Sequence, residues 1–268
     1  MDEGRLTTEL AALGVGAGGF LLVHSSLRAL GPVAGGGAAV LRALRAALGP
    51  GGTLVVPAFT AHNSDTSAEH RQRVRGLGAA EAAAFRAAME PYDAGRMPSS
   101  GVGVLPELVR TAPGALRSAH PQTSFAALGP FAEKVVSGHR ADCHLGEDSP
   151  LARLYDLGAR ILLLGTGYGT CSAFHLAEYR VPAPPRRTYR CVVRDGAGAG
   201  GATGRRWWAY EDVALDDGDF GALGADLEAS GTVAVRRGRV GAADCRVLGL
   251  ADAVDFGRAW LTRNRVVS

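Results

Sequence analysis

The 268-residue sequence contains a single lysine, Lys134, among its 29 basic residues. Aromatic residues make up only 6% of the chain, and no run of basic residues is interleaved with them. The formal net charge is only +3, and the arginines that supply most of the positive charge are scattered along the sequence. These features argue against a nucleic-acid-binding surface, which needs clustered positive charge.

Long apolar segments are also missing. No run approaches the roughly 18 apolar residues that a transmembrane helix needs. Residues 1–13 lack the basic and then apolar order of a signal peptide. The four cysteines, Cys143, Cys171, Cys191 and Cys245, form no C-x-x-C pair, which predicts free thiols. We therefore expect a cytoplasmic protein without a membrane partner.

Several common catalytic motifs do not occur. The sequence has no P-loop, no G-x-S-x-G turn, no H-E-x-x-H helix and no cysteine or histidine spacing typical of zinc, so no metal is expected. Two G-x-G-x-x-G matches occur, at Gly14–Gly19 and Gly196–Gly201. The first precedes a predicted strand and the second lies in a predicted hairpin loop, so we interpret both as turn glycines rather than dinucleotide sites.

The residues that are present predict a folded α/β protein. The chain is 47% hydrophobic, with a mean hydropathy of +0.05, which is enough for a substantial core. Three apolar runs, Phe20–His24, Thr53–Val56 and Arg160–Leu164, predict buried strands of a partly parallel sheet. Helix-period segments alternate with them, which favours a layered sheet flanked by helices. The predicted helices are Ala38–Leu48, Glu81–Met89, Val102–Arg110, Pro130–Val136, Ser149–Leu157, Cys171–Tyr179, Phe220–Ala229 and Asp252–Thr262.

The C-terminal third has a different character. Thr188–Arg194 and Arg205–Tyr210 flank a glycine-rich loop and predict a β-hairpin. Short strands are predicted near Val233–Val235 and Cys245–Leu248. Residues 182–250 therefore add antiparallel edge strands or form a small β-rich lobe within a single domain of residues 1–268. The long polar segment Thr60–Met97 is typical of a lid or binding loop.

The segment Ile161–Arg180 carries the strongest local signal for chemistry. A buried strand leads into Gly165-Thr166-Gly167-Tyr168-Gly169, and a helix follows. Glycines allow a tight turn, and free N–H groups at a helix start favour an anion or an oxyanion. His175 lies about one turn into this helix, with Glu178 at i+3 on the same face. From spacing alone, His175 is equally consistent with a catalytic base and with a buried structural histidine.

Other polar positions have two interpretations each. Ser25 and Ser26 follow the first strand, where ligands bind in open sheets, but they also suit a capped turn. Ser99 or Ser100 is a candidate helix N-cap that is also compatible with ligand binding. The acidic residues after the hairpin, and Asp65 in the long loop, could hold a polycationic substrate or lie in solvated loops.

Five segments in series resemble the aminoglycoside N3-acetyltransferase family. Their order and spacing hold over nearly the whole chain, although residues 61–97 and 182–219 match weakly. The resemblance implies an α/β fold distinct from that of common N-acetyltransferases, and acetyl-CoA as co-substrate without a metal. The matching segments are Leu21–Gly36, Gly49–Thr60, Met97–Gly129, Asp148–Glu178 and Gly238–Leu261.

The resemblance also implies roles for individual residues. His175 becomes the general base, paired with Glu211 or Asp212. Asp65, Glu178 and Asp217 become candidates for binding the ammonium groups of an aminoglycoside, and the weak matches leave another small amine open as substrate. The positions expected to contact coenzyme A are Ser25, Ser26, Leu27, Ser99, Ser100, Gly101, Val102 and Ser124.

We expect direct transfer of the acetyl group in a ternary complex, with backbone N–H groups near Thr166–Thr170 or Ser26–Leu27 stabilising the oxyanion. A ping-pong route through Cys171, four residues before His175, is a rival mechanism. A non-catalytic protein that binds coenzyme A or aminoglycosides is a rival of another class. The sequence does not decide whether the chain forms a homodimer.

Overall fold

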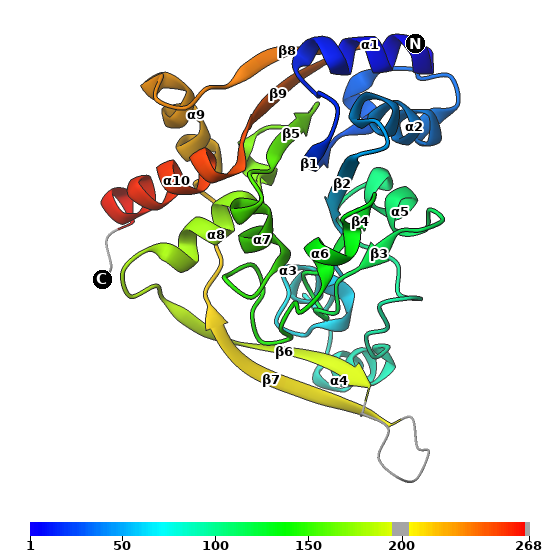
Figure 1. Cartoon of the computed structure of the whole chain (residues 1–268). Coiled ribbons are helices and arrows are strands. Elements are labelled where there is room, and N and C mark those ends of the chain that lie inside the picture. The colour runs from blue at the N-terminus through cyan, green and yellow to red at the C-terminus, as the bar shows by residue number, and fades with distance from the viewer. Residues whose placement is uncertain (195–203, 266–268) are drawn as a thin grey trace.

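The computed structural model describes residues 1–194 and 204–265, and the chain folds around a mixed seven-stranded sheet (Figure 1). The strand order is β3-β4-β2-β1-β5-β9-β8, and β6 and β7 form a separate two-stranded sheet. The strands are β1 (Gly19–Ser25), β2 (Gly52–Pro57), β3 (Leu116–Arg117), β4 (Phe125–Leu128), β5 (Arg160–Leu164), β6 (Arg186–Arg194), β7 (Arg205–Val213), β8 (Arg236–Val240) and β9 (Ala243–Gly249).

The centre of the main sheet is parallel and its edges are antiparallel. β1 pairs in parallel with β2 and β5, whereas β4 and β9 pair antiparallel with β2 and β5. All six residues of β2 are buried, and β1 and β5 are buried over most of their length. Continuous apolar runs are typical of strands covered on both faces. The predicted partly parallel α/β sheet and its three central strands are confirmed.

Helices cover both faces of this sheet. Alternate residues of β1 point to opposite sides, so Leu22 joins a core with α6 to α10, and Leu21 and Val23 join a core with α1, α2 and α5. The α-helices are α1 (Glu3–Leu13), α2 (Gly36–Leu48), α3 (Ala68–Arg73), α4 (Ala79–Ala88), α5 (Val104–Arg110), α6 (Ala132–Val136), α7 (Pro150–Asp156), α8 (Ala173–Arg180), α9 (Phe220–Ser230) and α10 (Leu250–Asn264). Three 3₁₀ turns are η1 (Leu27–Leu30), η2 (Ala61–Asn63) and η3 (Tyr168–Thr170). In the described part of the chain, none of the helices has both the length and the apolar character of a bilayer span.

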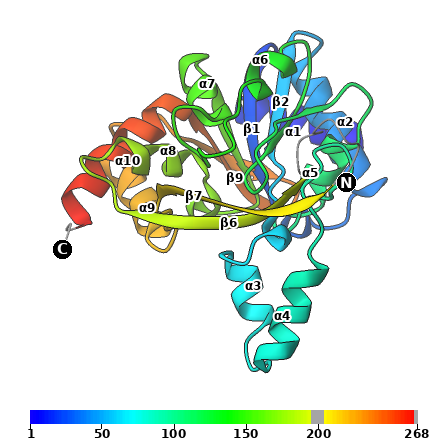
Figure 2. The same ribbon diagram turned by 90° about the horizontal axis from the view of Figure 1, so that it is seen from below.

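Several expectations need correction. The strand expected at Val233–Val235 begins at Arg236. The antiparallel edge strands expected in the C-terminal third are confirmed, since β8 and β9 extend the main sheet and β6 and β7 form the separate sheet. The long polar segment Thr60–Met97 carries two α-helices, α3 and α4, rather than one. They project from the body of the protein below the β6–β7 hairpin (Figure 2). The N-cap of α5 is Gly103 rather than Ser99 or Ser100. Helix α1 and strands β3 and β4 were not anticipated.

The two glycine motifs fall in different places. Gly14 terminates α1 with φ 104°, and the motif ends where β1 begins, as expected for turn glycines. The second motif, Gly196–Gly201, lies outside the described residues.

Gly224 of α9 provides a test of how the fold positions its glycine-rich turn. A Cβ atom at Gly224 would lie 2.0 Å from Cγ of Tyr168, the residue that begins η3. Alanine normally stabilises a helix relative to glycine by about 1 kcal/mol. We expect Gly224→Ala to lower stability instead, by about 1–3 kcal/mol, because of this overlap.

The matched control is Gly221→Ala in the same helix, where a Cβ atom would meet no atom within 4 Å. Thermal unfolding followed by circular dichroism compares the two variants. A melting temperature of Gly224→Ala equal to or above that of Gly221→Ala would contradict the packing described here.

Candidate active site

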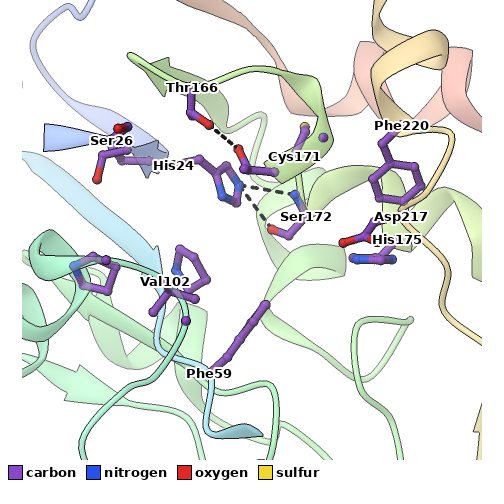
Figure 3. Close-up of a pocket in the computed structure, with 18 residues that line it drawn as sticks. His24, Ser26, Phe59, Val102, Thr166, Cys171, Ser172, His175, Asp217 and Phe220 are labelled. Atoms are coloured by element: carbon purple, nitrogen blue, oxygen red, sulfur yellow. Dashed lines mark hydrogen bonds between the residues drawn. The ribbon is translucent and has the colours of Figure 1, made fainter. Parts of the chain in front are cut away.

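A cavity of about 410 Å³ lies where the parallel strands β1 and β2 end (Figure 3). Because the carboxyl ends of parallel strands meet at one edge of a sheet, the segments that follow them converge there. The loop before α5, the turn between β5 and α8, and the start of α9 complete the walls. The lining residues are Val23, His24, Ser25, Ser26, Pro57, Phe59, Gly101, Val102, Gly103, Pro106, Thr166, Gly169, Thr170, Cys171, Ser172, His175, Asp217 and Phe220.

The glycine-rich turn after β5 delivers α8 to this cavity. Gly165 has φ 67°, and a Cβ atom there would lie 2.7 Å from Cβ of Ala29, so the position requires glycine. The backbone then forms η3 before α8 begins at Ala173. This brings His175, the third residue of α8, into the wall of the cavity.

His175 is held by the carboxylate of Glu178. The Nδ1 atom lies 2.6 Å from Oε2 of Glu178, within one turn of the same helix. The His175 side chain is 14% exposed and the Glu178 side chain only 3%. The ring packs against Phe220, with centroids 4.8 Å apart, and Asp217 lies beside it (Figure 3). An ionised carboxylate can only accept, so Nδ1 carries the proton and Nε2 keeps its lone pair.

The carboxylate of Glu178, expected to bind a substrate ammonium group, accepts hydrogen bonds from three groups of the protein itself. Its Oε1 atom accepts the backbone N–H of Asp216 at 3.0 Å and the guanidinium of Arg265. Arg265 also binds Asp219, with Nε 2.8 Å from Oδ2. Three of the roughly four acceptor positions of a carboxylate are therefore used within the protein. The contact with Glu178 fixes the orientation of the His175 ring.

The expected pairing of His175 with Glu211 or Asp212 is wrong. Asp212 is buried and is paired with His144. Its carboxylate accepts a hydrogen bond from the backbone N–H of His144 at 2.7 Å, and the Nδ1 atom of the His144 ring lies 3.1 Å away. Glu211 is exposed, because successive residues of β7 face opposite sides of the hairpin. The structure thus gives His175 a partner from its own helix.

The positions expected to contact coenzyme A divide into two groups. Ser25, Ser26, Gly101 and Val102 line the cavity. The remaining four positions are not among its lining residues. Leu27 packs against a hydrophobic core, Ser99 donates to Glu107, Ser100 bonds His62 and the Ala61 N–H, and the fully buried Ser124 donates to the Ala58 carbonyl.

The other two candidates for binding a substrate ammonium group, Asp217 and Asp65, lie in different surroundings. Asp217 lines the cavity beside His175. The carboxylate of Asp65 is paired with the guanidinium of Arg190, whose Nε lies 3.0 Å from Oδ2. An ammonium group could bind Asp65 only by displacing this arginine.

His24 is a cavity residue that the sequence analysis did not single out. It belongs to β1, and its Nε2 atom lies 3.4 Å from the backbone N and 3.3 Å from Oγ of Ser172. Burial, and then the positive charge that His175 can carry, lower the pKa of His24 to about 3. Its position, one residue before the serines that end β1, was the available signal.

A second group of histidines lies behind the hairpin, buried away from the cavity. The His120 ring stacks on that of His139, with centroids 4.8 Å apart, and packs at a tilt against that of His144, with centroids 4.7 Å apart. Burial lowers the pKa of all three, that of His139 to about 4. These rings stay neutral in the folded protein at neutral pH. No group of three or more His, Cys, Asp or Glu side chains among residues 1–194 and 204–265 is arranged to hold a metal ion.

An imidazole held by a carboxylate beside a cavity is an arrangement that enzymes use for general-base catalysis. Residues 22–262 match the family model for aminoglycoside 3-N-acetyltransferase, and the chain belongs to this family of acyltransferases.

Relatives resemble the chain over almost its full length. Aminoglycoside N(3)-acetyltransferase VIII of Streptomyces fradiae is 37% identical, covering 97% of this chain and 92% of its own. The crystal structure of YokD from Bacillus subtilis superposes with a TM-score of 0.89 at 32% identity, over 99% of this chain and 95% of that one. The solved AAC-IIIb, a binary complex with CoASH, has a TM-score of 0.81 at 31% identity, over 97% of this chain and 96% of that one.

The buried histidines predict how stability depends on pH. Their pKa values are lower in the folded chain than the value of about 6.5 for a free histidine. The unfolded chain therefore binds more protons below about pH 6.5, and stability that is present above this pH is lost as the pH falls toward 4. We expect His139→Gln to reduce the steepness of this loss by about one proton per molecule.

Urea unfolding at a series of pH values between 7 and 4.5 measures the effect. The substitution also removes hydrogen bonds at every pH, so the slope against pH is the informative quantity. Parallel curves for the wild type and the variant would contradict a neutral His139 in the folded state.

Proposed function

We propose that the chain transfers the acetyl group of acetyl-CoA to an amine of an aminoglycoside, at the 3-amino group, with His175 as general base. The observation that carries this proposal is the 2.6 Å contact of His175 Nδ1 with the buried Glu178, beside an open cavity. The name of the Streptomyces relative supports the acceptor class, and the CoASH complex of AAC-IIIb supports the donor. The reaction takes place in the cytosol, where acetyl-CoA is available.

The proton chemistry follows from the tautomer of His175. An ammonium group has no lone pair, so the acceptor nitrogen must lose a proton before or during its attack on the thioester. Because Nδ1–H donates to Glu178, Nε2 is free to take that proton. The buried carboxylate then stabilises the imidazolium that forms, and such a base contributes about 10²–10⁴ in rate.

The cavity walls supply positions for both reactants. Ser25, Ser26, Gly101 and Val102 lie on the side formed by β1 and the loop before α5, which suits the pantetheine arm. Asp217 lies beside His175 and suits an ammonium group close to the reacting amine (Figure 3). The reaction therefore needs only the positioning of two substrates and one proton acceptor.

The expected oxyanion donors are only partly available. The backbone N–H of Ser26 donates to the Leu164 carbonyl at 2.9 Å, and that of Thr170 donates to the Gly167 carbonyl at 3.2 Å. These two groups cannot also bind an oxyanion without breaking existing bonds. A side-chain donor in the cavity can therefore add to the stabilisation that the remaining N–H groups give.

Substitution of His175 tests the proposed function. We expect His175→Ala to lower kcat by about 10²–10⁴, because no other base replaces Nε2, while acetyl-CoA still binds. Release of the CoA thiol over a panel of aminoglycosides and simple amines measures turnover, and mass spectrometry identifies the product.

Calorimetric titration with CoA shows whether the variant keeps its donor site. Turnover near that of the wild type in His175→Ala would refute the base assignment. Ligand binding by the wild type without thiol release from any amine would favour a non-catalytic binding protein.

The ping-pong alternative requires a reactive thiol at Cys171. Its side chain is completely buried, and burial raises its thiol pKa to about 12, so the thiolate is scarce at neutral pH. We expect Cys171→Ser to keep kcat within about threefold of the wild type, since direct transfer does not use the sulfur atom. Rapid quenching with radiolabelled acetyl-CoA provides the check, because an acetylated protein lost in Cys171→Ser would establish the covalent route.

A further inference from the structure

His24 occupies the cavity with one ring nitrogen committed to the protein. It lies near the carboxyl end of β1, faces the start of α8, and is 5% exposed (Figure 3). Its Nε2 atom contacts both the backbone N and the hydroxyl of Ser172, the residue that precedes α8. Among the described residues, its Nδ1 atom has no hydrogen-bond partner.

The contact with Ser172 decides the tautomer of His24. A backbone N–H can only donate, so Nε2 must accept from it with its lone pair. A neutral imidazole with an accepting Nε2 carries its proton on Nδ1. The free nitrogen of His24 is therefore an N–H donor.

The surroundings keep this donor neutral. The ring is buried, and the other titratable ring in the cavity, His175, opposes a second positive charge. With a pKa lowered to about 3, His24 is uncharged at neutral pH. A neutral N–H group can donate a hydrogen bond to a developing oxyanion while keeping its own proton.

We propose that the Nδ1–H of His24 donates a hydrogen bond to the carbonyl oxygen of the acetyl thioester and stabilises the tetrahedral oxyanion. This inference rests on the proposed acetyl transfer. It fills the position left by the Ser26 and Thr170 N–H groups, which are bonded to other atoms. His24 and His175 line the same cavity, so one thioester can lie between them.

The two histidines have different roles in the proposed acetyl transfer. The acceptor nitrogen forms a bond to the carbonyl carbon, the π electrons move to oxygen, and His175 Nε2 takes the proton from nitrogen. The oxyanion then re-forms the carbonyl, the C–S bond breaks, and the thiolate leaves and receives the proton from His175. His24 keeps its own proton throughout.

The competing explanation is that His24 only holds Ser172 and the start of α8. The two explanations use different ring nitrogens and therefore respond differently to two amide substitutions. The terminal amide of asparagine lies near the Nδ1 position, whereas that of glutamine reaches the Nε2 position. His24→Asn keeps a donor toward the cavity, and His24→Gln keeps an acceptor toward Ser172.

We expect His24→Gln to lose about 10²–10³ in kcat, the effect of removing one oxyanion donor, with the KM for acetyl-CoA changed little. We expect His24→Asn to recover at least tenfold of that loss. The pH profile of kcat/KM should keep its shape in both variants, because His24 does not titrate in the working range. Steady-state thiol release with the amine that the wild type uses best measures these quantities.

Thermal unfolding and calorimetric binding of CoA show that each variant is folded and keeps its donor site. Equal kcat values for the two variants, or a higher value for His24→Gln, would overturn the role of Nδ1. If the wild type itself releases no thiol with any amine, the proposed acetyl transfer fails. An active wild type with an unaffected His24→Gln variant refutes only the oxyanion donor.

Discussion

The buried carboxylate of Glu178 is the interaction on which the arrangement of the site depends. An isolated carboxylate at 3% exposure would be strongly disfavoured. Here the imidazole N–H of His175, the guanidinium of Arg265 and the backbone N–H of Asp216 all donate to it. These groups come from α8, from the end of α10 and from the segment after β7. The orientation of the His175 imidazole is therefore coupled to the packing of the C-terminal part of the chain.

The central strands and the helix that carries His175 were predictable because their signals are local. Leu54–Val56 and Ile161–Leu164 are apolar without interruption, as two-sided burial requires. β4 was missed because Phe125–Leu128 is only four residues long and contains two alanines, which have low strand propensity. Helix α1 also carries a local signal, because Leu6, Leu10 and Leu13 recur at helical spacing after the N-cap Asp2.

The polar partners in the site were harder to predict, because a cluster of acids in sequence does not say which way each one faces. Strand alternation sends Asp212 inward to His144 and leaves its neighbour Glu211 exposed. Arg265 completes the surroundings of Glu178 from 87 residues away, a distance at which spacing carries no information. Ser124 lies at a position where the family resemblance implies a contact with coenzyme A. In the structure it is buried just before β4, and its hydroxyl donates to the Ala58 carbonyl instead. Local patterns thus gave the strands and the helix that carries His175, the resemblance singled out His175 itself, and tertiary packing determined its partners.

Two histidines in one cavity are held in opposite hydrogen-bonding states by their neighbours. Glu178 can only accept, so His175 donates through Nδ1 and keeps an accepting Nε2. The Ser172 N–H can only donate, so His24 accepts through Nε2 and keeps a donating Nδ1. Environment rather than residue type separates an acid-like group from a base-like group, as it does for paired carboxylates in other enzymes. An acyl transfer needs both a proton acceptor for the amine and a donor for the carbonyl oxygen. In the proposed reaction His175 and His24 take these two roles, because a carboxylate lies behind one ring and a helix start behind the other.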